Sequence, residues 1–223
     1  MRALFTLVVL LVAACATETK TTDGLVSVPS SKFDDLYLRP QADLSTYRAV
    51  LIEPVAVKFR SDFLTRKHGY NHLLAQPLHK PYQDPDSLAQ DLASLMQASL
   101  VDAFRRANYE IAATPGPGVL RIAARIDELY VNAPDEMSSS VRVAFNRDTG
   151  QALLLLNASD SVSGDMLARI AHLNIVREVT RANLADDTTN RFWFETAFRR
   201  WAGSVTDAFG TSRRTTVSLT DQR

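Results

Sequence analysis

The chain has 223 residues, with 25 basic and 25 acidic side chains and a single cysteine. This charge balance argues against nucleic acid as the partner, since nucleic acid is bound by a concentrated basic surface. One cysteine cannot form an internal disulfide, so the fold must be stable without one. The length suits a single domain with its own core.

The first 14 residues have the features of a secretory signal. Met1 and Arg2 give a short positive start, and residues 3–14 are apolar or small apart from one threonine. The run is shorter than the ~20 apolar residues of a transmembrane helix. It also ends in small residues, as cleavable signals do. We therefore expect residues 1–14 to be a signal peptide.

The only cysteine, Cys15, directly follows this run in the sequence Leu-Val-Ala-Ala-Cys. The pattern resembles the lipobox of bacterial lipoproteins. That resemblance implies that Cys15 carries a diacylglyceryl thioether, that the signal is cut before it, and that its new amino group is acylated. A thiolate is the nucleophile that this chemistry needs, and two acyl chains hold a protein stably on a membrane. By the same resemblance, Ala16 in place of aspartate favours the outer membrane, facing the periplasm. The alternative is an ordinary secretory signal in which Cys15 has no role.

The residues after the cysteine predict a tether followed by a strand. Residues 16–31 are polar, rich in threonine and serine, and have neither hydrophobic period, so we expect 15–31 to be the lipidated cysteine with a flexible tether. The first ordered element is expected at 36–38 and a strong strand at 49–59. Pro54 cannot donate to a ladder, which predicts an edge strand or a break there.

A long helix is the clearest element of the first half. Residues 60–83 are irregular, and Asp84 and Pro85 then provide an N-cap and a first helical residue. The helix is expected to stop near Asn108. Its apolar stripe consists of Leu88, Leu92, Leu95, Met96, Leu100 and Phe104.

The second half predicts antiparallel strands. After a turn at 114–118, residues 119–131 alternate as a half-buried strand does. A short strand is expected at 141–145 and a firm one from 152. Gly164 offers the positive φ of a hairpin turn that returns the chain into 165–175. The inward positions of the first strand are Leu120, Ile122, Ala124 and Ile126.

A final helix is predicted over 191–209, with Gly210 as its C-terminal cap and a tail over 211–223. Amphipathic helices of this kind bury one stripe against one face of a sheet. We therefore expect one α+β domain over 32–210. Its architecture is a two-layer α/β sandwich, with a mostly antiparallel sheet and two main helices on one face.

No pattern in the chain names a reaction. His68 and His72 are four residues apart and His79 is near, as in some metal sites, but no nearby carboxylate or cysteine completes a ligand set. The serines lack the G-x-S-x-G elbow of a hydrolase. Asp127 and Glu128 point to opposite faces of a strand. We expect no catalytic residue, metal or cofactor.

Trp193 is the one candidate contact residue outside the anchor. It lies off the apolar stripe of the final helix, so we predict that it contacts a partner. The alternative is that it covers an edge of the sheet, as buried tryptophans often do.

Three stretches are together similar to one family. They are "LYLRPQADLSTYRAVLIEPVAVKFRSDF" (36–63), "PGPGVLRIAARIDEL" (115–129) and "SDSVSGDMLARI" (159–170). They resemble the uncharacterised bacterial lipoproteins that share domain of unknown function 3313. The family implies no reaction, cofactor or catalytic residue. The last stretch also resembles a hairpin of envelope lipoproteins that assist ABC transporters or activate cell-wall synthases, where the domain binds envelope partners.

These observations favour a non-catalytic lipoprotein of the bacterial envelope. It would be held on a membrane through Cys15 and would bind another envelope protein or a cell-wall component. Two alternatives stay open: an envelope hydrolase with its site in the 60–83 loop, which needs convergent titratable groups, and a carrier of a small apolar ligand, which needs an apolar cavity.

Overall fold

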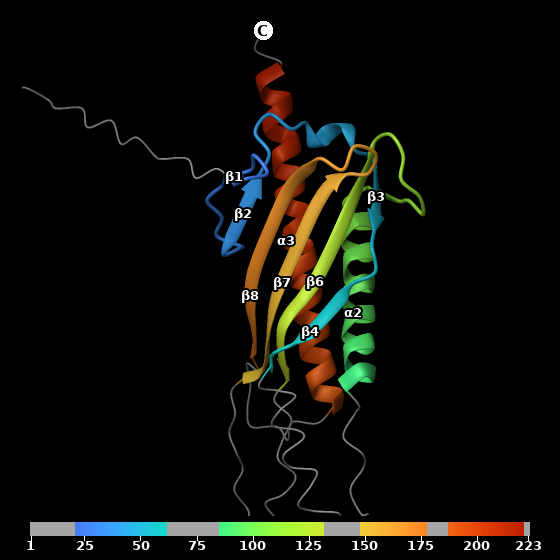
Figure 1. The fold of residues 1–223 in the computed structure, drawn as a ribbon, viewed down its shortest axis with the longest axis vertical. Coiled ribbons are helices and arrows are strands. Elements are labelled where there is room, and N and C mark those ends of the chain that lie inside the picture. The colour runs from blue at the N-terminus through green and yellow to red at the C-terminus, as the bar shows by residue number, and fades with distance from the viewer. Residues whose placement is uncertain (1–20, 62–84, 132–147, 178–186, 221–223) are drawn as a thin grey trace, which may run out of the picture.

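A computed structural model describes residues 21–61, 85–131, 148–177 and 187–220. One sheet of eight strands lies over two helices (Figure 1). This confirms the predicted α+β class, with a mostly antiparallel sheet and two main helices on one face. The elements are β1 (Val26–Ser27), β2 (Asp35–Leu38), the 3-10 helix η1 (Leu44–Thr46), β3 (Ala49–Ile52), β4 (Ala56–Phe59), α2 (Pro85–Arg106), β5 (Glu110–Ile111), β6 (Val119–Val131), β7 (Asp148–Asp160), β8 (Met166–Arg177) and α3 (Asp187–Thr220).

The strand order is β1-β2-β8-β7-β6-β3-β5, and β4 also pairs with β6. The long strands β6, β7 and β8 form an antiparallel centre. The strand predicted at 49–59 is present in two pieces, β3 and β4, which run parallel to β6 on either side of Pro54. The predicted break at this proline is confirmed.

The alternation predicted for β6 is also confirmed, because its four inward residues from Leu120 to Ile126 are buried. The pattern then changes at a bulge, where Glu128 has a φ of 52° and the register with β7 shifts between Asp127 and Tyr130. One extra residue moves the following side chain to the opposite face. Leu129 is buried as a result, and the strand keeps its apolar face on the helices.

The helix α2 ends as expected beside Asn108, which has a φ of 62°. The Asn108 N–H donates to the Arg105 carbonyl, and the Tyr109 N–H donates to the Phe104 carbonyl. These are the two bonds of a Schellman C-cap, with asparagine in the left-handed position that glycine usually takes. The rings of Phe104 and Tyr109 meet edge to face at 5.3 Å, which adds the apolar contact of that motif.

The helix α3 is longer than predicted at both ends, and Gly210 does not cap it. The described glycines with positive φ are Gly24, Gly118 and Gly164, so Gly210 keeps a helical backbone. Glycine takes right-handed and left-handed φ about equally, and its position alone therefore does not end a helix. The expected tail is helical as far as Thr220. Neither described helix combines the length and apolarity that crossing a bilayer requires.

The ordered fold begins before the predicted boundary at residue 32. Leu25 is fully buried, and β1 pairs with β2. Asp23 forms an ion pair with Arg169 of β8. The expected tether therefore does not extend through 21–31. A single buried leucine in a polar stretch leaves no hydrophobic period to reveal this segment. The short strand expected at 141–145 lies outside the described residues, and β1 and β5 were not predicted.

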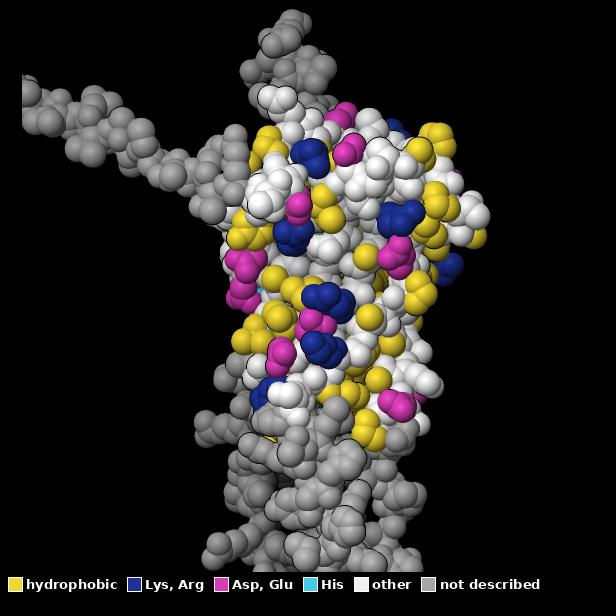
Figure 2. Space-filling view, viewed as in Figure 1, with side chains coloured by type: hydrophobic (Ala, Val, Ile, Leu, Met, Phe, Trp, Pro, Cys, Tyr) yellow, Lys and Arg dark blue, Asp and Glu magenta, His cyan; other side chains and the backbone are white. Residues whose placement is uncertain are grey.

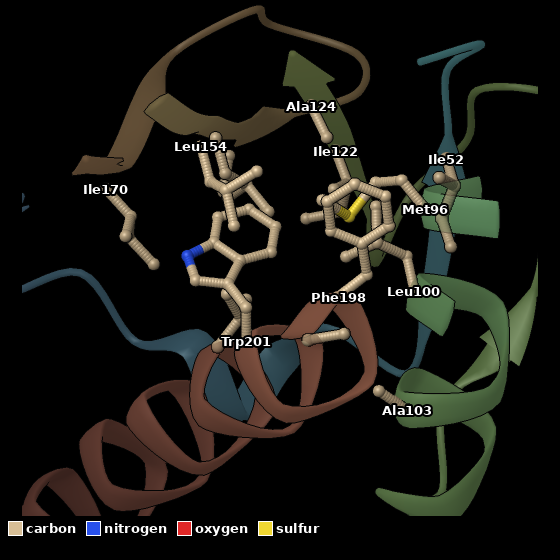
Figure 3. Packing of buried hydrophobic residues seen from close by; sticks show 14 of the residues in the cluster. Ile52, Met96, Leu100, Ala103, Ile122, Ala124, Leu154, Ile170, Phe198 and Trp201 are labelled. Carbon is tan, nitrogen blue, oxygen red and sulfur yellow. The ribbon is translucent and has the colours of Figure 1, made fainter. Parts of the chain in front are cut away.

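The core lies between the sheet and the two helices (Figure 3). Phe198 and Trp201 point from α3 toward the sheet, beside Met96 from α2. Gly150 of β7 allows α3 to approach closely, because a Cβ there would lie 2.7 Å from Phe194 Cζ. The largest fully buried side chains are Phe104, Phe194, Phe198, Phe209, Leu25, Met96, Leu100, Leu120, Ile122, Ile126, Leu129 and Leu154.

Candidate binding surface

The sheet has one face packed on the helices and a second face that no described element covers (Figures 1 and 2). Strand alternation directs the side chains between the buried positions to this second face. We call it the outer face. Its described members on the central strands and β3 include Leu51, Arg121, Ala123, Arg125, Leu153, Leu155, Asn157, Ser159, Arg169, Ala171 and Leu173.

Apolar side chains gather on the outer face where β7 meets β8. Leu153 lies opposite Leu173, and Leu155 lies opposite Ala171. We call these four residues the leucine patch. Leu173 is 44% exposed and is one of three exposed large apolar side chains among the described residues, with Val162 and Phe192. Covering such surface is favourable by about 25 cal/mol per Å² of apolar area, and exposed apolar patches often mark binding sites.

Charged side chains on and beside the outer face occur as pairs of opposite sign (Figure 2). Arg121 Nη1 lies 3.4 Å from Oε1 of Glu53, the residue that directly follows β3. Arg125 Nη2 lies 3.1 Å from Asp127 Oδ2. Arg169 pairs with Asp23. Solvent-accessible ion pairs of this kind contribute little stability. Their side chains can therefore give up each other and hydrogen-bond to a partner protein at a small cost in free energy. The face is therefore polar without a strong net charge.

Asp34 lies next to β8 at the point where β2 no longer pairs with it. The first β2 residue, Asp35, pairs with Ala171. Just beyond it, the Leu173 N–H donates to Asp34 Oδ2 at 2.7 Å, and His172 Nδ1 lies 3.3 Å from the same oxygen. The carboxylate satisfies a backbone donor that would otherwise point to the next strand. Asp34 therefore marks the start of an edge of the sheet.

The serine-rich turn between β7 and β8 is held by hydrogen bonds that give it a structural role. The buried Ser161 hydroxyl donates to the Gly116 carbonyl and accepts from the Gly116 N–H. Asp160 accepts from the N–H groups of Val162 and Ser163. Both predicted turns, 114–118 and the β7–β8 turn, are thereby tied together at one end of the sheet.

Tyr47 completes this turn cluster. Its hydroxyl donates to Asp160 Oδ2 at 2.9 Å. Burial, reinforced by the carboxylate, raises the pKa of Tyr47 to about 12. The N–H groups of Ser163 and Val162 lower the pKa of Asp160 from its ordinary value of 3.8. Both groups therefore keep fixed protonation states at neutral pH, which suits a rigid support and not proton transfer.

Most of the residues singled out from the sequence are outside the part of the chain that the structure describes. Cys15, His68, His72 and His79 lie outside the described residues. Within the described ranges, no three His, Cys, Asp or Glu side chains lie close enough together to hold a metal ion.

Trp193 lies near the start of α3, is partly buried and packs against the core. Its neighbour Phe192 is 58% exposed, and the two rings meet at 5.3 Å. The partner contact at Trp193 stays a prediction, and Phe192 presents the more accessible ring of the two.

The leucine patch was not predicted, although the sequence holds its signal. Residues 153–156 are four consecutive leucines. Such continuous apolar runs are typical of strands that are covered on both faces. Only one face of β7 is covered by the described helices, so the outward leucines of this run could have been identified as a candidate contact surface.

Comparisons with known proteins give a family and three distant structural likenesses. A family model described as "Protein of unknown function (DUF3313)" matches residues 19–184. Curated protein sequences gave no match. A PelC dodecamer subunit from Paraburkholderia phytofirmans is 9% identical, with a TM-score of 0.36 over 74% of this chain and 96% of its own. A putative neuraminyllactose-binding hemagglutinin homolog from Helicobacter pylori is 12% identical, with a TM-score of 0.37 over 82% and 94%.

A DUF330 protein from Xanthomonas campestris is 15% identical, with a TM-score of 0.35 over 92% of this chain and 97% of its own. These scores are too low to establish a common fold, and we transfer nothing from these proteins to this chain.

Proposed function

The chain belongs to the DUF3313 family, whose function is unknown, and we propose that it is a non-catalytic binding module of the bacterial cell envelope. In this proposal, Cys15 carries lipid and holds the domain on the outer membrane, facing the periplasm. The outer face of the sheet binds another envelope protein or a cell-wall component. Neither a cofactor nor nucleic acid takes part.

The proposal rests on one observation: helices cover one face of the sheet, and no described element covers the other. Two helices cover one face, while the other presents the leucine patch beside ion-paired arginines. A patch with a partly exposed centre and a polar surround has the composition of a protein-binding surface. The titratable side chains of the turn cluster are committed to fixed hydrogen bonds and offer no acid–base pair.

The packing between the layers also favours binding over transport of a small apolar ligand. Side chains from both helices and the sheet fill this space, and those of Phe198, Leu100 and Leu154 have no accessible surface. A carrier would need a cavity of several hundred Å³ in this layer. The described core instead is filled by its own side chains.

Anchoring would provide the mechanism. A membrane-held domain meets a membrane-bound or wall-bound partner at a high effective concentration, so a modest intrinsic affinity suffices. The balanced charge of the chain, with 25 basic and 25 acidic residues, agrees with a partner that is not a polyanion.

Site-specific photo-crosslinking in intact cells tests the binding surface. A benzophenone amino acid is placed at Leu155, in the leucine patch, or at Ala98, an exposed residue of α2 on the other side of the molecule. We expect a discrete adduct from Leu155, identified by mass spectrometry, that is reduced at least fivefold by Arg125→Glu. Ala98 should give none. An adduct from Ala98 alone, or none from either position in the membrane-bound protein, would contradict a partner on the outer face.

Fractionation tests the anchor separately. The wild-type protein should be recovered with membranes, and Cys15→Ala should be recovered as a soluble, unlipidated and folded precursor. Mass analysis of the wild-type N-terminus should show the added acyl mass on Cys15. A bare Cys15, or a Cys15→Ala variant that stays wholly with membranes, would remove the lipid from the proposal without affecting the crosslinking result.

A further inference from the structure

One of the three ion-paired arginines of the outer face is held by a residue from outside the sheet. The acidic partners of Arg121 and Arg125 lie within a strand or directly follow one. The partner of Arg169 is Asp23, which precedes β1 in the chain. Asp23 can therefore leave its arginine without breaking a strand pair.

Asp23 belongs to a short loop that is fixed at one end. We call residues 21–25 the entry loop. The Thr21 N–H donates to the Leu25 carbonyl, and the Gly24 N–H donates to the Thr21 carbonyl. Leu25 is fully buried, whereas residues 22–24 are exposed. Gly24 has a φ of 76°, and a Cβ there would meet nothing within 4 Å. Because glycine changes its backbone conformation easily, the exposed part of the entry loop can move while Leu25 stays in place.

Two polar contacts join Asp23 to the rest of the described chain. Arg169 Nη2 lies 2.5 Å from Asp23 Oδ2, and Arg39 Nη2 donates to the Asp23 carbonyl over a long 3.4 Å. The side chains of Arg169 and Asp23 are 37% and 42% exposed. Ion pairs with this access to water contribute little stability. Detaching Asp23 from Arg169 therefore costs little free energy once another anion takes its place.

We propose that Asp23 masks Arg169, and that an aspartate or glutamate of the protein bound to the outer face takes its place. This inference rests on the proposed function and adds the chemistry of the partner. Arg169 borders the leucine patch, because Ala171 lies two residues farther along β8 on the same face, about 7 Å away. Arg169 Nε also donates to Asn157 Oδ1 at 3.4 Å, a contact on the outer face that does not involve Asp23.

The surroundings of Arg169 favour a carboxylate that belongs to a protein. A guanidinium binds carboxylates strongly, because its N–H groups match the two oxygens, and arginine is enriched in protein interfaces. Asp23 already presents this group to Arg169 in the structure. The leucine patch beside it gains from apolar contacts, which a protein can supply next to its acidic side chains.

Photo-crosslinking of the full chain in intact cells tests the masking, with the benzophenone amino acid at Leu155. Asp23→Asn removes the competing charge and keeps the side-chain shape, so we expect at least twice the adduct of the wild type. Arg169→Gln removes the binding group and should lower the adduct at least threefold. Adding Asp23→Asn to Arg169→Gln should cause no further change, because no arginine is left to unmask.

Asp207→Asn is the matched control. The Asp207 carboxylate pairs with Lys32 at 2.8 Å, and both side chains are well exposed. This pair also joins the N-terminal segment to the rest of the domain, but it does so on α3, away from the outer face. Its loss should therefore leave the adduct from Leu155 unchanged. Circular dichroism and urea midpoints confirm that each variant is folded before its yield is compared.

The outcomes separate this inference from the proposed function. An adduct that forms but is not increased by Asp23→Asn would overturn the masking and leave the outer-face partner in place. So would an increase that persists in the Arg169→Gln background, since the effect would not pass through this arginine. An adduct that is lost on muramidase digestion would show a cell-wall component and overturn the choice of a protein. The absence of an adduct from every variant would contradict the proposed function itself.

Discussion

Gly150 should not tolerate even a methyl group, and replacing it tests how α3 is seated on the sheet. A Cβ at this position would lie 2.5 Å from the Tyr130 carbonyl oxygen and 2.7 Å from Phe194 Cζ. The first obstacle is backbone within the β6–β7 pair, and the second is a ring that is almost completely buried. Neither can move away cheaply. Overpacking of this kind costs about 1–3 kcal/mol, and we expect Gly150→Ala to lie near the upper end.

The assay is urea unfolding followed by tryptophan fluorescence, which is suitable because Trp201 is buried in the core. The matched control is Gly203→Ala in α3, where a Cβ meets nothing within 4 Å. Alanine is favoured over glycine in a helix by roughly 0.5–1 kcal/mol, so this variant should be stabilised. A Gly150→Ala protein as stable as the wild type, with an unchanged slope against urea, would refute the close approach of β7, β6 and α3.

Substitutions at three further positions test individual elements. Gly210→Ala should stabilise the protein by roughly 0.5–1 kcal/mol if α3 continues through this residue, whereas a loss of stability on urea unfolding would restore the left-handed cap. Asn108→Ala should cost about 1 kcal/mol because of its left-handed φ, while Asn108→Gly should be neutral or stabilising; equal effects of both in thermal unfolding would contradict the Schellman cap. Tyr47→Phe should cost about 1.5–3 kcal/mol, since it removes a hydrogen bond to a carboxylate. The pKa of Asp160 is lowered in the folded protein. The stabilisation that ionised Asp160 gives the fold should therefore be present above its unfolded pKa of 3.8 and be lost as the pH falls through the folded pKa. A chemical-shift titration of Asp160 with a midpoint at or above 3.8 would disprove this.

Elements whose signals are local could be predicted from the sequence. The start of α2 follows from Pro85, and its end follows from Asn108, because caps depend on a few neighbouring residues. The inward side chains of β6 follow from strict alternation, and the β7–β8 turn follows from Gly164, whose φ is 77°. Pro54 correctly indicated the break between β3 and β4, since a missing donor interrupts a ladder wherever it lies.

Features that depend on distant parts of the chain could not be predicted. The parallel pairing of β3 with β6 joins residues about seventy positions apart, and nothing near Leu51 specifies Arg121 as its neighbour. The burial of Leu25 depends on β2 and β8 being present beside it. The prediction that Gly210 caps the final helix was wrong, because glycine can adopt the left-handed φ of a C-terminal cap but does not have to. On the candidate surface, the leucine patch was not predicted from the four consecutive leucines at 153–156, because only the three-dimensional sheet shows which of its faces the helices leave uncovered and that Leu173 stays exposed.

With the lipid proposed at Cys15, the early start of the fold would limit how far the domain can move from the membrane. Thr21 is the sixth residue after Cys15, and six residues reach at most about 20 Å. With the lipid that we propose, the end of the sheet that carries β1 and the β7–β8 turn stays close to the bilayer. The other end of β7 is Asp148, 12 residues from Asp160, and it lies about 40 Å farther along the strand. In the proposed arrangement, the short segment between Cys15 and Thr21 would hold one end of the domain near the membrane. The opposite end, where Phe192 lies near the start of α3, would be free to change its orientation relative to the membrane.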